Sequence, residues 1–289
     1  MLSIVIPVYN RERLVSRAVR SVLDQQVPPG WSMELLVVDD GSTDGTGAVL
    51  RDLEREYGPP WGGKVLRILS RPRGGTPGGA RNYGVAHARG EVLAFLDSDD
   101  EWLPEKLLRQ IPLHEGGEVL THTRERWIRD GREISQGGRR FSRHRRSGDL
   151  LEDALVKCII GPSTVMISRD VWERSGGFRE DLEIAEDYEY WLRLTALTAV
   201  AYLDLPLTVK YAGHGDQLSE KYGQIETFRI RALRPLVEER WFARHRDGTA
   251  QAMAERELLR KALIYAAGAR KRGRIAEAEE YERLARRYS

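Results

Sequence analysis

Hydrophobic residues in the first hundred positions gather in four short runs, and the segments between the runs carry a helical repeat. Each run has the length of a β-strand, while the intervening segments place apolar residues three and four positions apart, as amphipathic helices do. The four runs are LSIVIPV (2–8), MELLVVDD (33–40), KVLRILS (64–70) and EVLAFLD (91–97). The helical segments are residues 12–25, 45–58 and 78–88. Strands that alternate with helices predict an α/β fold with a mostly parallel central sheet flanked by helices.

The pattern continues less regularly beyond residue 100. Residues 163–178 predict a strand, a short helix and a glycine stop. Residues 186–197 predict an amphipathic helix in which Glu189 and Arg193 are spaced as an i,i+4 ion pair. The polar stretch 120–150 predicts an exposed loop. Its arginine-rich part (137–148) is either a solvated surface or a lid or site for an anionic acceptor.

The C-terminal segment predicts helices only. Residues 256–288 carry the repeat of two helices joined around Gly268 to Gly273, which is a helical hairpin. A hairpin of this kind usually packs against its own domain or against a second copy of the chain. We therefore expect it to support folding or a homodimer, and we assign it no chemistry.

Polar residues follow each of the four N-terminal runs. Ligands of parallel sheets bind beyond the carboxyl ends of the strands, so these residues are expected to converge on one crevice. They are Tyr9 and Asn10, Asp39 and Asp40, Ser70 and Arg71, and the acidic cluster Asp97, Asp99, Asp100 and Glu101.

The acidic cluster predicts a positive partner, because like charges this close repel one another. Mg²⁺ and Mn²⁺ prefer oxygen ligands and commonly use one or two carboxylates together with substrate phosphate, which suits Asp97 and Asp99. The alternative is that Asp99, Asp100 and Glu101 occupy the first turn of a helix beginning near Pro104, where acids suit the helix dipole. Both hold if Asp100 and Glu101 serve the helix while Asp97 and Asp99 serve the metal.

Composition and charge exclude several classes of protein. At 289 residues and 41% hydrophobic the chain can bury a full core, and 46 basic residues nearly cancel 44 acidic ones, so nothing predicts nucleic-acid binding. The single cysteine, Cys158, excludes an internal disulfide and a multi-thiolate metal site, and its apolar surroundings predict a buried structural thiol. No secretory signal or transmembrane run is visible. We expect a cytoplasmic protein, with peripheral attachment to the inner membrane face left open.

Two other folds with acids at strand ends fit less well. A receiver domain needs a phosphate-accepting aspartate at a following strand end, but Asp52 falls inside a helical pattern. A haloacid-dehalogenase-type phosphatase needs its acidic pair near the first strand with a hydroxyl residue close behind. DSDDE (97–101) follows the fourth strand and has no such hydroxyl.

Four segments resemble, in order and spacing, the successive signatures of the family 2 inverting glycosyltransferases. They are SIVIPVYNRERLVSRAVRSVLDQ, ELLVVDDGSTDGT, GGARNYGVAHARGEVLAFLDSDDEW and EDYEYWLR. The resemblance runs from residue 2 to about 219 and implies the GT-A fold, a Rossmann-like sheet. It implies a glycosyltransferase domain over 1–219, with a nucleotide-binding half (1–100) and an acceptor half (101–219), followed by a C-terminal helical extension (220–289).

The resemblance also implies which residues bind the nucleotide. In such enzymes Asp39 would face uracil, Asp40 would support the turn, and Arg71 would reach the base or phosphates, with Arg73 as the alternative. Arg81 would meet the diphosphate. The remaining nucleotide-binding positions implied are Pro7, Tyr9, Asn10, Arg11, Glu12 and Ser98.

The chemistry implied is a single displacement at the anomeric carbon. Asp97-Ser98-Asp99 matches the family's DXD motif, with Asp99 as the first ligand of Mn²⁺ or Mg²⁺ and Asp97 as a second contact to ribose or metal. Asp187 matches the general base that takes the proton of the acceptor hydroxyl. His214 matches a late position that meets the metal or diphosphate, or is simply polar surface.

We therefore expect a metal-dependent inverting glycosyltransferase of glycan or polysaccharide biosynthesis. Its donor is a nucleotide-diphosphate sugar, with UDP favoured, and its acceptor is an unidentified hydroxyl on a saccharide or lipid-linked glycan. The QxxRW motif of processive synthases is missing, which favours transfer of one sugar. Two alternatives stay open: an inactive sugar-nucleotide-binding paralogue or scaffold, and a sugar nucleotidyltransferase, although IPVYNRERL (6–14) lacks the glycines of that class.

Overall fold

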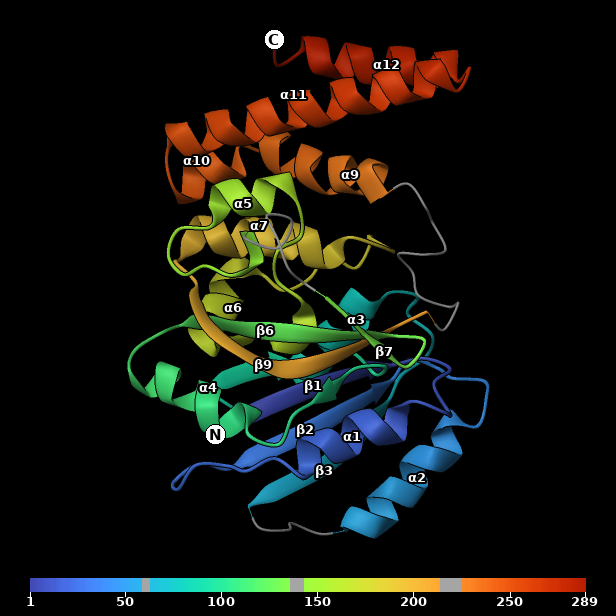
Figure 1. Ribbon diagram of the computed structural model, residues 1–289, viewed down its shortest axis with the longest axis vertical. Coiled ribbons are helices and arrows are strands. Elements are labelled where there is room, and N and C mark those ends of the chain that lie inside the picture. The colour runs from blue at the N-terminus through green and yellow to red at the C-terminus, as the bar shows by residue number, and fades with distance from the viewer. Residues whose placement is uncertain (59–62, 136–142, 214–224) are drawn as a thin grey trace.

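The structure is a computed structural model that describes residues 1–58, 63–135, 143–213 and 225–289. A curled sheet lies at the centre, helices cover both of its faces, and the C-terminal helices are stacked at one end of the molecule (Figure 1). The described residues form a nine-stranded sheet with the order β3-β2-β1-β4-β8-β6-β9-β5, and β7 pairs with β6.

The N-terminal half of the sheet is parallel, as predicted. Leu2 of β1 lies opposite Met33 of β2 and Val92 of β4, and Met33 in turn lies opposite Lys64 of β3. Every residue of β1 is buried, because neighbouring strands and helices enclose it on all sides. The strands are β1 (Leu2–Val8), β2 (Met33–Asp39), β3 (Lys64–Ser70) and β4 (Val92–Phe95).

The second half of the sheet introduces antiparallel pairs that the sequence pattern did not indicate. β8 pairs antiparallel with both β4 and β6, β9 runs parallel to β6, and β5 pairs antiparallel with β9. The fold class is confirmed as α/β, with a mixed rather than uniformly parallel sheet. These strands are β5 (Glu101–Trp102), β6 (Leu120–Arg129), β7 (Arg132–Ile134), β8 (Met166–Ser168) and β9 (Ala201–Ala212).

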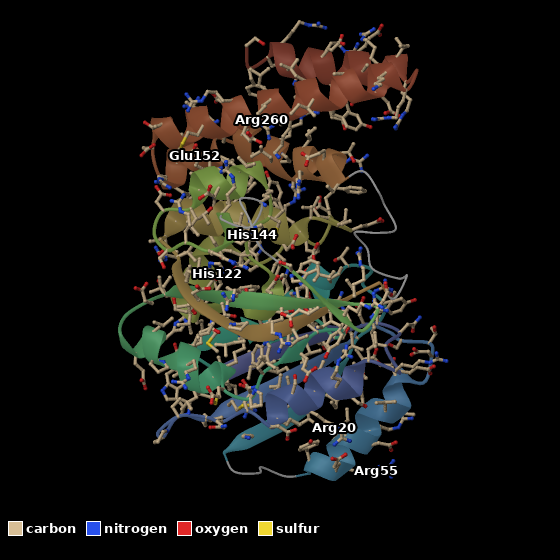
Figure 2. All side chains as sticks on the ribbon, viewed as in Figure 1. Arg20, Arg55, His122, His144, Glu152 and Arg260 are labelled. Carbon is tan, nitrogen blue, oxygen red and sulfur yellow. The ribbon has the colours of Figure 1, made fainter. Side chains whose placement is uncertain are left out.

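Two hydrophobic cores lie on opposite faces of the sheet. Alternate residues of β1 point to opposite faces, so Ile4 and Ile6 join one core with α1, α2 and α4, whereas Val5 joins the other with α3, α6 and α7. Charged side chains such as Arg55 and Arg260 stand on the outer sides of helices (Figure 2). The helices before residue 200 are α1 (Val15–Leu23), α2 (Thr46–Tyr57), α3 (Pro77–Ala86), α4 (Lys106–Glu115), α5 (Leu151–Val156), the 3₁₀ turn η2 (Pro162–Thr164), α6 (Arg169–Ser175) and α7 (Glu186–Leu197).

Three local predictions were wrong. Residues 120–134 form the hairpin of β6 and β7 rather than a loop, because pairing with β9 satisfies the backbone whatever the side-chain polarity. Glu101 lies in β5 and α4 begins only at Lys106, so Asp100 and Glu101 do not serve the first turn of a helix.

The part of the arginine-rich loop at 136–142 lies outside the described residues.

The third error concerns α7, which is buried on nearly all sides rather than amphipathic. The helix lies between the sheet and the C-terminal helices, so Tyr188 to Ala196 are all buried. The predicted pair forms inside this layer: Arg193 Nε donates to Glu189 at 2.9 Å. Arg193 also donates to the carbonyl oxygens of Ser175 and Gly177, which anchors α7 to the glycine stop after α6.

The C-terminal helices extend the core that covers α7. Phe242, Leu258 and Ala262 belong to the same hydrophobic cluster as Tyr188 and Trp191. The predicted helical hairpin is confirmed as α11 and α12, and no helix in the described ranges is long and apolar enough to cross a membrane. These helices are α9 (Ile225–Glu238), α10 (Trp241–His245), α11 (Gly248–Lys271) and α12 (Ile275–Arg286).

Candidate functional site

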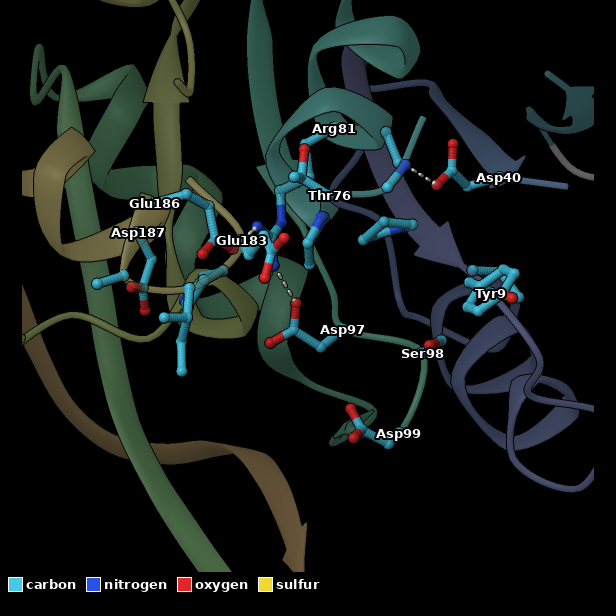
Figure 3. Close-up of a pocket in the computed structure, with 18 of the residues that line it drawn as sticks. Tyr9, Asp40, Thr76, Arg81, Asp97, Ser98, Asp99, Glu183, Glu186 and Asp187 are labelled. Atoms are coloured by element: carbon cyan, nitrogen blue, oxygen red, sulfur yellow. Dashed lines mark hydrogen bonds and ion pairs between the residues drawn. The ribbon is translucent and has the colours of Figure 1, made fainter. Parts of the chain in front are cut away.

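A cavity of about 920 Å³ opens at the carboxyl ends of β1 and β4, where the first residues of α3 and α7 also meet (Figure 3). The convergence of strand-end residues predicted from the sequence is therefore present. Ten of the predicted site residues line this cavity: Pro7, Tyr9, Asn10, Arg11, Asp40, Arg81, Asp97, Ser98, Asp99 and Asp187.

The turns after β1 and β2 are bonded to each other. Asn10, in the left-handed region at φ 51°, accepts the backbone N–H of Thr43 at 2.8 Å with its side-chain oxygen. Its own backbone N–H donates to the Ser42 hydroxyl at 2.9 Å. The two strand ends thus form one rigid edge of the cavity, with the partly exposed ring of Tyr9 beside it.

Asp40 folds the glycine-rich segment after β3 against this edge. Its buried carboxylate accepts the backbone N–H groups of Gly74 at 2.9 Å and Gly75 at 3.2 Å, and it pairs with the Nε of Arg71 at 3.1 Å. Asp40 also pairs with Arg73, whose guanidinium lies 3.6 Å from the centre of the Tyr9 ring. Arg73 lines the cavity, as the alternative to Arg71 proposed from the sequence.

Three of the predicted nucleotide-binding residues do not line the cavity. Glu12 accepts the backbone N–H of Gly45 at 2.9 Å, Asp39 accepts that of Ser42 at 3.0 Å, and Arg71 donates to the carbonyl of Gly79 at 2.6 Å. Their contacts support turns, and their roles toward a nucleotide stay predictions. His214 lies outside the described residues.

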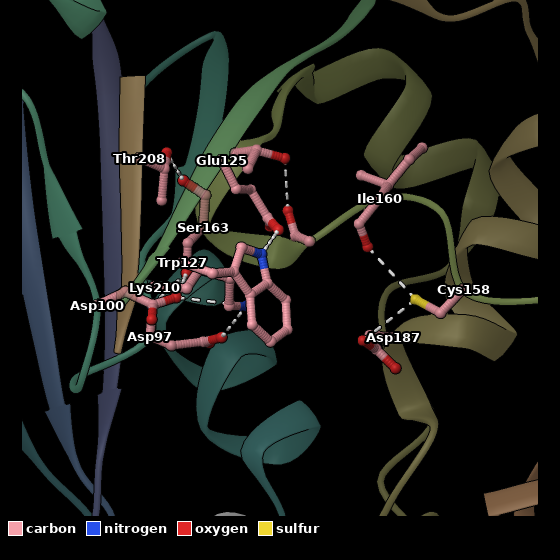
Figure 4. Close-up of polar contacts among 12 residues, drawn as sticks. Asp97, Asp100, Glu125, Trp127, Cys158, Ile160, Ser163, Asp187, Thr208 and Lys210 are labelled. Carbon is pink, nitrogen blue, oxygen red and sulfur yellow. Dashed lines mark hydrogen bonds and ion pairs between the residues drawn. The ribbon is translucent and has the colours of Figure 1, made fainter. Parts of the chain in front are cut away.

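The acidic cluster after β4 has positive partners within the chain (Figure 4). Arg81 donates to Asp97 at 2.6 Å, and the Lys210 ammonium lies 3.9 Å from Asp97 and 3.4 Å from Asp100. Burial raises the pKa of Asp100 to about 8, although Lys210 opposes the shift. Burial disfavours the charge of Asp97 too, but Arg81 and Lys210 outweigh it and lower the pKa of that carboxyl. Charge repulsion alone therefore does not require a metal ion here.

Arg81 also joins the acidic cluster to the start of α7. One terminal nitrogen donates to Asp97 and the other donates to Glu186 at 2.8 Å, while the side chain is almost fully buried. Burial raises the pKa of Glu186 to about 7 against the opposing charge of Arg81. Arg81 thus ties the end of β4 to the start of α7, and because it also lines the cavity, its contact with a diphosphate stays a prediction.

Asp187, the predicted base, is the second residue of α7 and faces the cavity. Ala185, the residue just before α7, has φ 64°. This left-handed conformation costs energy for a residue with a side chain and often occurs at functional sites. One carboxylate oxygen of Asp187 accepts the Tyr188 N–H at 2.6 Å, and the other accepts the Cys158 thiol at 3.4 Å.

Cys158 was predicted to be a buried structural thiol, whereas in the structure it is only partly buried and lies in the cavity wall beside Asp187. Burial, together with the negative charge of Asp187, raises the pKa of the Cys158 thiol well above its usual value. The thiol is therefore neutral and donates a hydrogen bond to the carboxylate. The sequence offers no local signal of this contact, because 28 residues separate the two.

The thiol is expected to react slowly in the folded protein. Only the thiolate is nucleophilic, so reaction of Cys158 with Ellman's reagent at pH 8 should be at least about 10-fold slower in the native protein than in urea. Because Cys158 is the sole cysteine, the absorbance of the released thiol reports this residue alone. Equal rates in both states would contradict the hydrogen-bonded, neutral thiol.

The C-terminal helices contribute to the same cavity. Ile225 and Arg229 of α9 line it, and Arg229 forms an ion pair with Glu226. Arg229 also lies over the ring of Tyr188. The helical extension thus forms a wall of the site on the side of Asp187, which periodicity in the sequence could not reveal.

The residues around Asp97 and Asp99 suit a divalent cation that shares its coordination with a ligand. The described part of the chain contains no group of three or more His, Cys, Asp or Glu side chains able to hold a metal by themselves. Hard cations such as Mg²⁺ are commonly held by one or two carboxylates and complete their shell with water and phosphate. Asp97 and Asp99 at the cavity wall fit this mode.

Comparisons with known proteins agree with these observations. The family model described as Glycosyl transferase family 2 matches residues 3–176. An uncharacterized glycosyltransferase of Nostoc sp. is 41% identical over 119 residues, covering 41% of this chain and 34% of that protein. The putative teichuronic acid biosynthesis glycosyltransferase TuaG of Bacillus subtilis is 31% identical over 206 residues, covering 70% of this chain and 75% of that protein. The chain spans about a third of the length of the Nostoc protein and of a similar relative in Rickettsia felis.

A solved structure shares the fold. TarS residues 1–349 of S. aureus, in complex with UDP-GlcNAc, superposes with a TM-score of 0.71 at 22% identity, covering 90% of this chain and 72% of that one. The agreement extends well beyond the segment matched by the family model, so the overall arrangement of the sheet and its helices is confirmed.

Proposed function

The chain belongs to glycosyl transferase family 2, and from this membership we propose that it transfers a sugar from a nucleotide-diphosphate donor to a hydroxyl group. One observation carries the proposal. The DXD aspartates and Asp187 line one cavity, and Arg81 links the two groups through Asp97 and Glu186. In this proposal one buried side chain ties the donor-binding side of the reaction to the proton-accepting side.

The donor that we propose is a UDP-sugar. TarS, which shares the fold, has been solved with UDP-GlcNAc and with UDP. In the present chain the edge formed by Tyr9, Asn10 and Arg73 offers an aromatic ring, an amide and a guanidinium beside the cavity. These groups suit a nucleotide base and its phosphates.

We propose that Asp99 and Asp97, with His214, hold Mn²⁺ or Mg²⁺. Bound there, the ion would supply positive charge that stabilises the departing diphosphate. A mannosyltransferase of Pyrobaculum calidifontis with the same fold, 17% identical at a TM-score of 0.64, was solved with GDP-Man and Mn²⁺, which supports a metal of this kind.

Asp187 acts as the general base in this proposal. A sugar hydroxyl becomes an effective nucleophile as its proton leaves, and a carboxylate within hydrogen-bond reach accepts that proton. The acceptor oxygen then attacks the anomeric carbon opposite the diphosphate, so one displacement inverts the configuration. Cys158 and Arg229 line the cavity together with Asp187, and we propose that the acceptor binds on this side. The likeness to TuaG supports a role in polysaccharide biosynthesis.

Metal-dependent nucleotide binding tests the donor side. UDP at about 100 times its dissociation constant should stabilise the folded protein by about 2.7 kcal/mol, and Mn²⁺ should increase the stabilisation at a fixed UDP concentration. Asp99→Asn should remove the Mn²⁺-dependent part of the thermal shift because it removes a negatively charged ligand. Asp170→Asn, at an exposed acid on α6, is the matched control and should behave as wild type. A full Mn²⁺ effect in Asp99→Asn would contradict the assigned ligand.

An assay of UDP-sugar hydrolysis, in which water takes the place of the acceptor, distinguishes an enzyme from an inactive nucleotide-binding paralogue. Release of UDP from a panel of UDP-sugars in the presence of Mn²⁺ supports the transferase. Binding of UDP without any release would instead support a sensor or scaffold.

A further inference from the structure

Lys210 is a partly buried cation with no role in the reaction as proposed above. It lies within β9, where its side chain reaches the cavity wall next to the acidic cluster (Figure 4). Its side chain is 20% exposed, and desolvating an ammonium group is costly unless nearby charges compensate. A charge kept at this desolvation cost is expected to have a function in the site.

The carboxylates around Lys210 do not depend on it for hydrogen bonds. Asp97 already accepts from Arg81 at 2.6 Å, and Asp100 accepts from the Ser163 hydroxyl at 2.6 Å. The distances from the Lys210 ammonium, 3.9 Å to Asp97 and 3.4 Å to Asp100, are both longer than an ordinary N–H···O hydrogen bond. Lys210 is therefore attracted to these acids without being tightly bonded to either.

The ammonium group is consequently able to serve another acceptor. It carries three N–H donors on a flexible stem, and its nearest carboxylates hold it loosely at the cavity surface. Lysine side chains are protonated at neutral pH, so the group presents a positive charge to a ligand that enters the cavity.

We propose that Lys210 binds the diphosphate of the nucleotide donor as a phosphate ligand supplied by the chain itself. This inference rests on the proposed function, because it assigns a contact to the donor of that reaction. Lys210 would then hold a nucleoside diphosphate even without a divalent cation, and a metal at Asp99 would add to that affinity. No bond is made or broken in this role.

The alternative is that Lys210 only offsets the negative charge of Asp97 and Asp100. That role would affect protein stability and the local field, but it would not distinguish a diphosphate from the same nucleoside without phosphate. The comparison between uridine and UDP therefore decides between the two roles.

Isothermal titration in EDTA supplies the test, with uridine and UDP as the probes. Wild type should bind UDP at least about 10-fold more tightly than uridine, since a hydrogen bond to a charged group is worth that much or more. Lys210→Met should lose at least about 10-fold in UDP affinity and less than about 2-fold in uridine affinity. Lys210→Arg, which keeps the charge, should retain most of the UDP affinity. Lys271→Met, at the exposed end of α11, is the control for the loss of one positive charge.

Several results would overturn the inference. In wild type, metal-free binding of UDP no tighter than that of uridine refutes it without any variant. In Lys210→Met, unchanged UDP affinity, or equal losses for UDP and uridine, assigns Lys210 to charge balance alone. Failure of wild type to bind UDP even with Mn²⁺ refutes the proposed function as well, which distinguishes the two failures.

Discussion

Replacing Asp187 with asparagine is expected to reduce sugar transfer by about 10²- to 10⁴-fold, the usual contribution of a general base. Asparagine keeps the size of the side chain and can still accept the Tyr188 N–H, so the start of α7 should be preserved. It cannot accept the acceptor's proton. The effect should appear in kcat for UDP release from the UDP-sugar that wild type hydrolyses, whereas the dissociation constant for UDP should change by less than about 2-fold because the donor-binding residues are untouched.

The control for this experiment is Asp181→Asn, which removes an exposed carboxylate six positions earlier on the same connection. Asp181 pairs with Arg179 and does not line the cavity, so its variant should retain wild-type turnover. Turnover of Asp187→Asn within about 2-fold of wild type would remove this residue from the role of base. A parallel loss of UDP binding would instead indicate damage to the donor site.

Replacing Arg81 with methionine is expected to lower the free energy of unfolding by about 3–5 kcal/mol, the cost of breaking a buried ion pair from one side. The substitution leaves the buried carboxylate of Glu186 and the partly buried carboxylate of Asp97 without their shared cation. Many domains are stable by only about 5–15 kcal/mol, so this loss should be evident in urea unfolding followed by circular dichroism.

The loss should also depend on pH. In the native protein the pKa of Glu186 is raised to about 7, above its unfolded value, so protonation favours the folded state. The contribution of this group to stability is present below its unfolded pKa and is lost as pH rises through the folded pKa. Without Arg81 the charged form is less favourable still, so the deficit of Arg81→Met should be larger at pH 8 than at pH 5.5.

Arg55→Met provides the matched control, since Arg55 also pairs with an aspartate but lies on the outer side of α2. The side chains of Arg55 and Asp52 are 77% and 67% exposed, and pairs of this kind contribute about 0–1 kcal/mol. Equal losses in the two variants would show that the bridge through Arg81 has no special structural role.

Several features of this protein were predictable from the sequence because they depend on neighbours in the chain. The four buried strands of the N-terminal half follow from runs of apolar residues, and the convergence of Tyr9, Asp40 and Asp97 follows from the rule for parallel sheets. The helical hairpin of α11 and α12 follows from its periodicity. The resemblance to glycosyltransferases was correct for the same reason, since its motifs are short segments of adjacent residues.

Predictions failed where polarity was used to infer exposure. The charged strand β6 was taken for a loop, although backbone pairing with β9 does not require apolar side chains. The helix α7 carries charged residues but is buried, because Glu189 and Arg193 neutralise each other inside the protein. In both cases the environment that tolerates the polar residues is built by segments distant in sequence.

The sequence by itself determined the class of fold, the family and several of the acids that face the cavity, such as Asp97, Asp99 and Asp187, since each of these is recorded in local patterns. Only the tertiary structure decided which charges meet. Arg81 bridges residues 97 and 186, Lys210 reaches Asp97 and Asp100 from a late strand, and Cys158 touches Asp187. The energy of such contacts depends on the distance between charges and on their burial, and both quantities are set by how the sheet and the C-terminal helices pack.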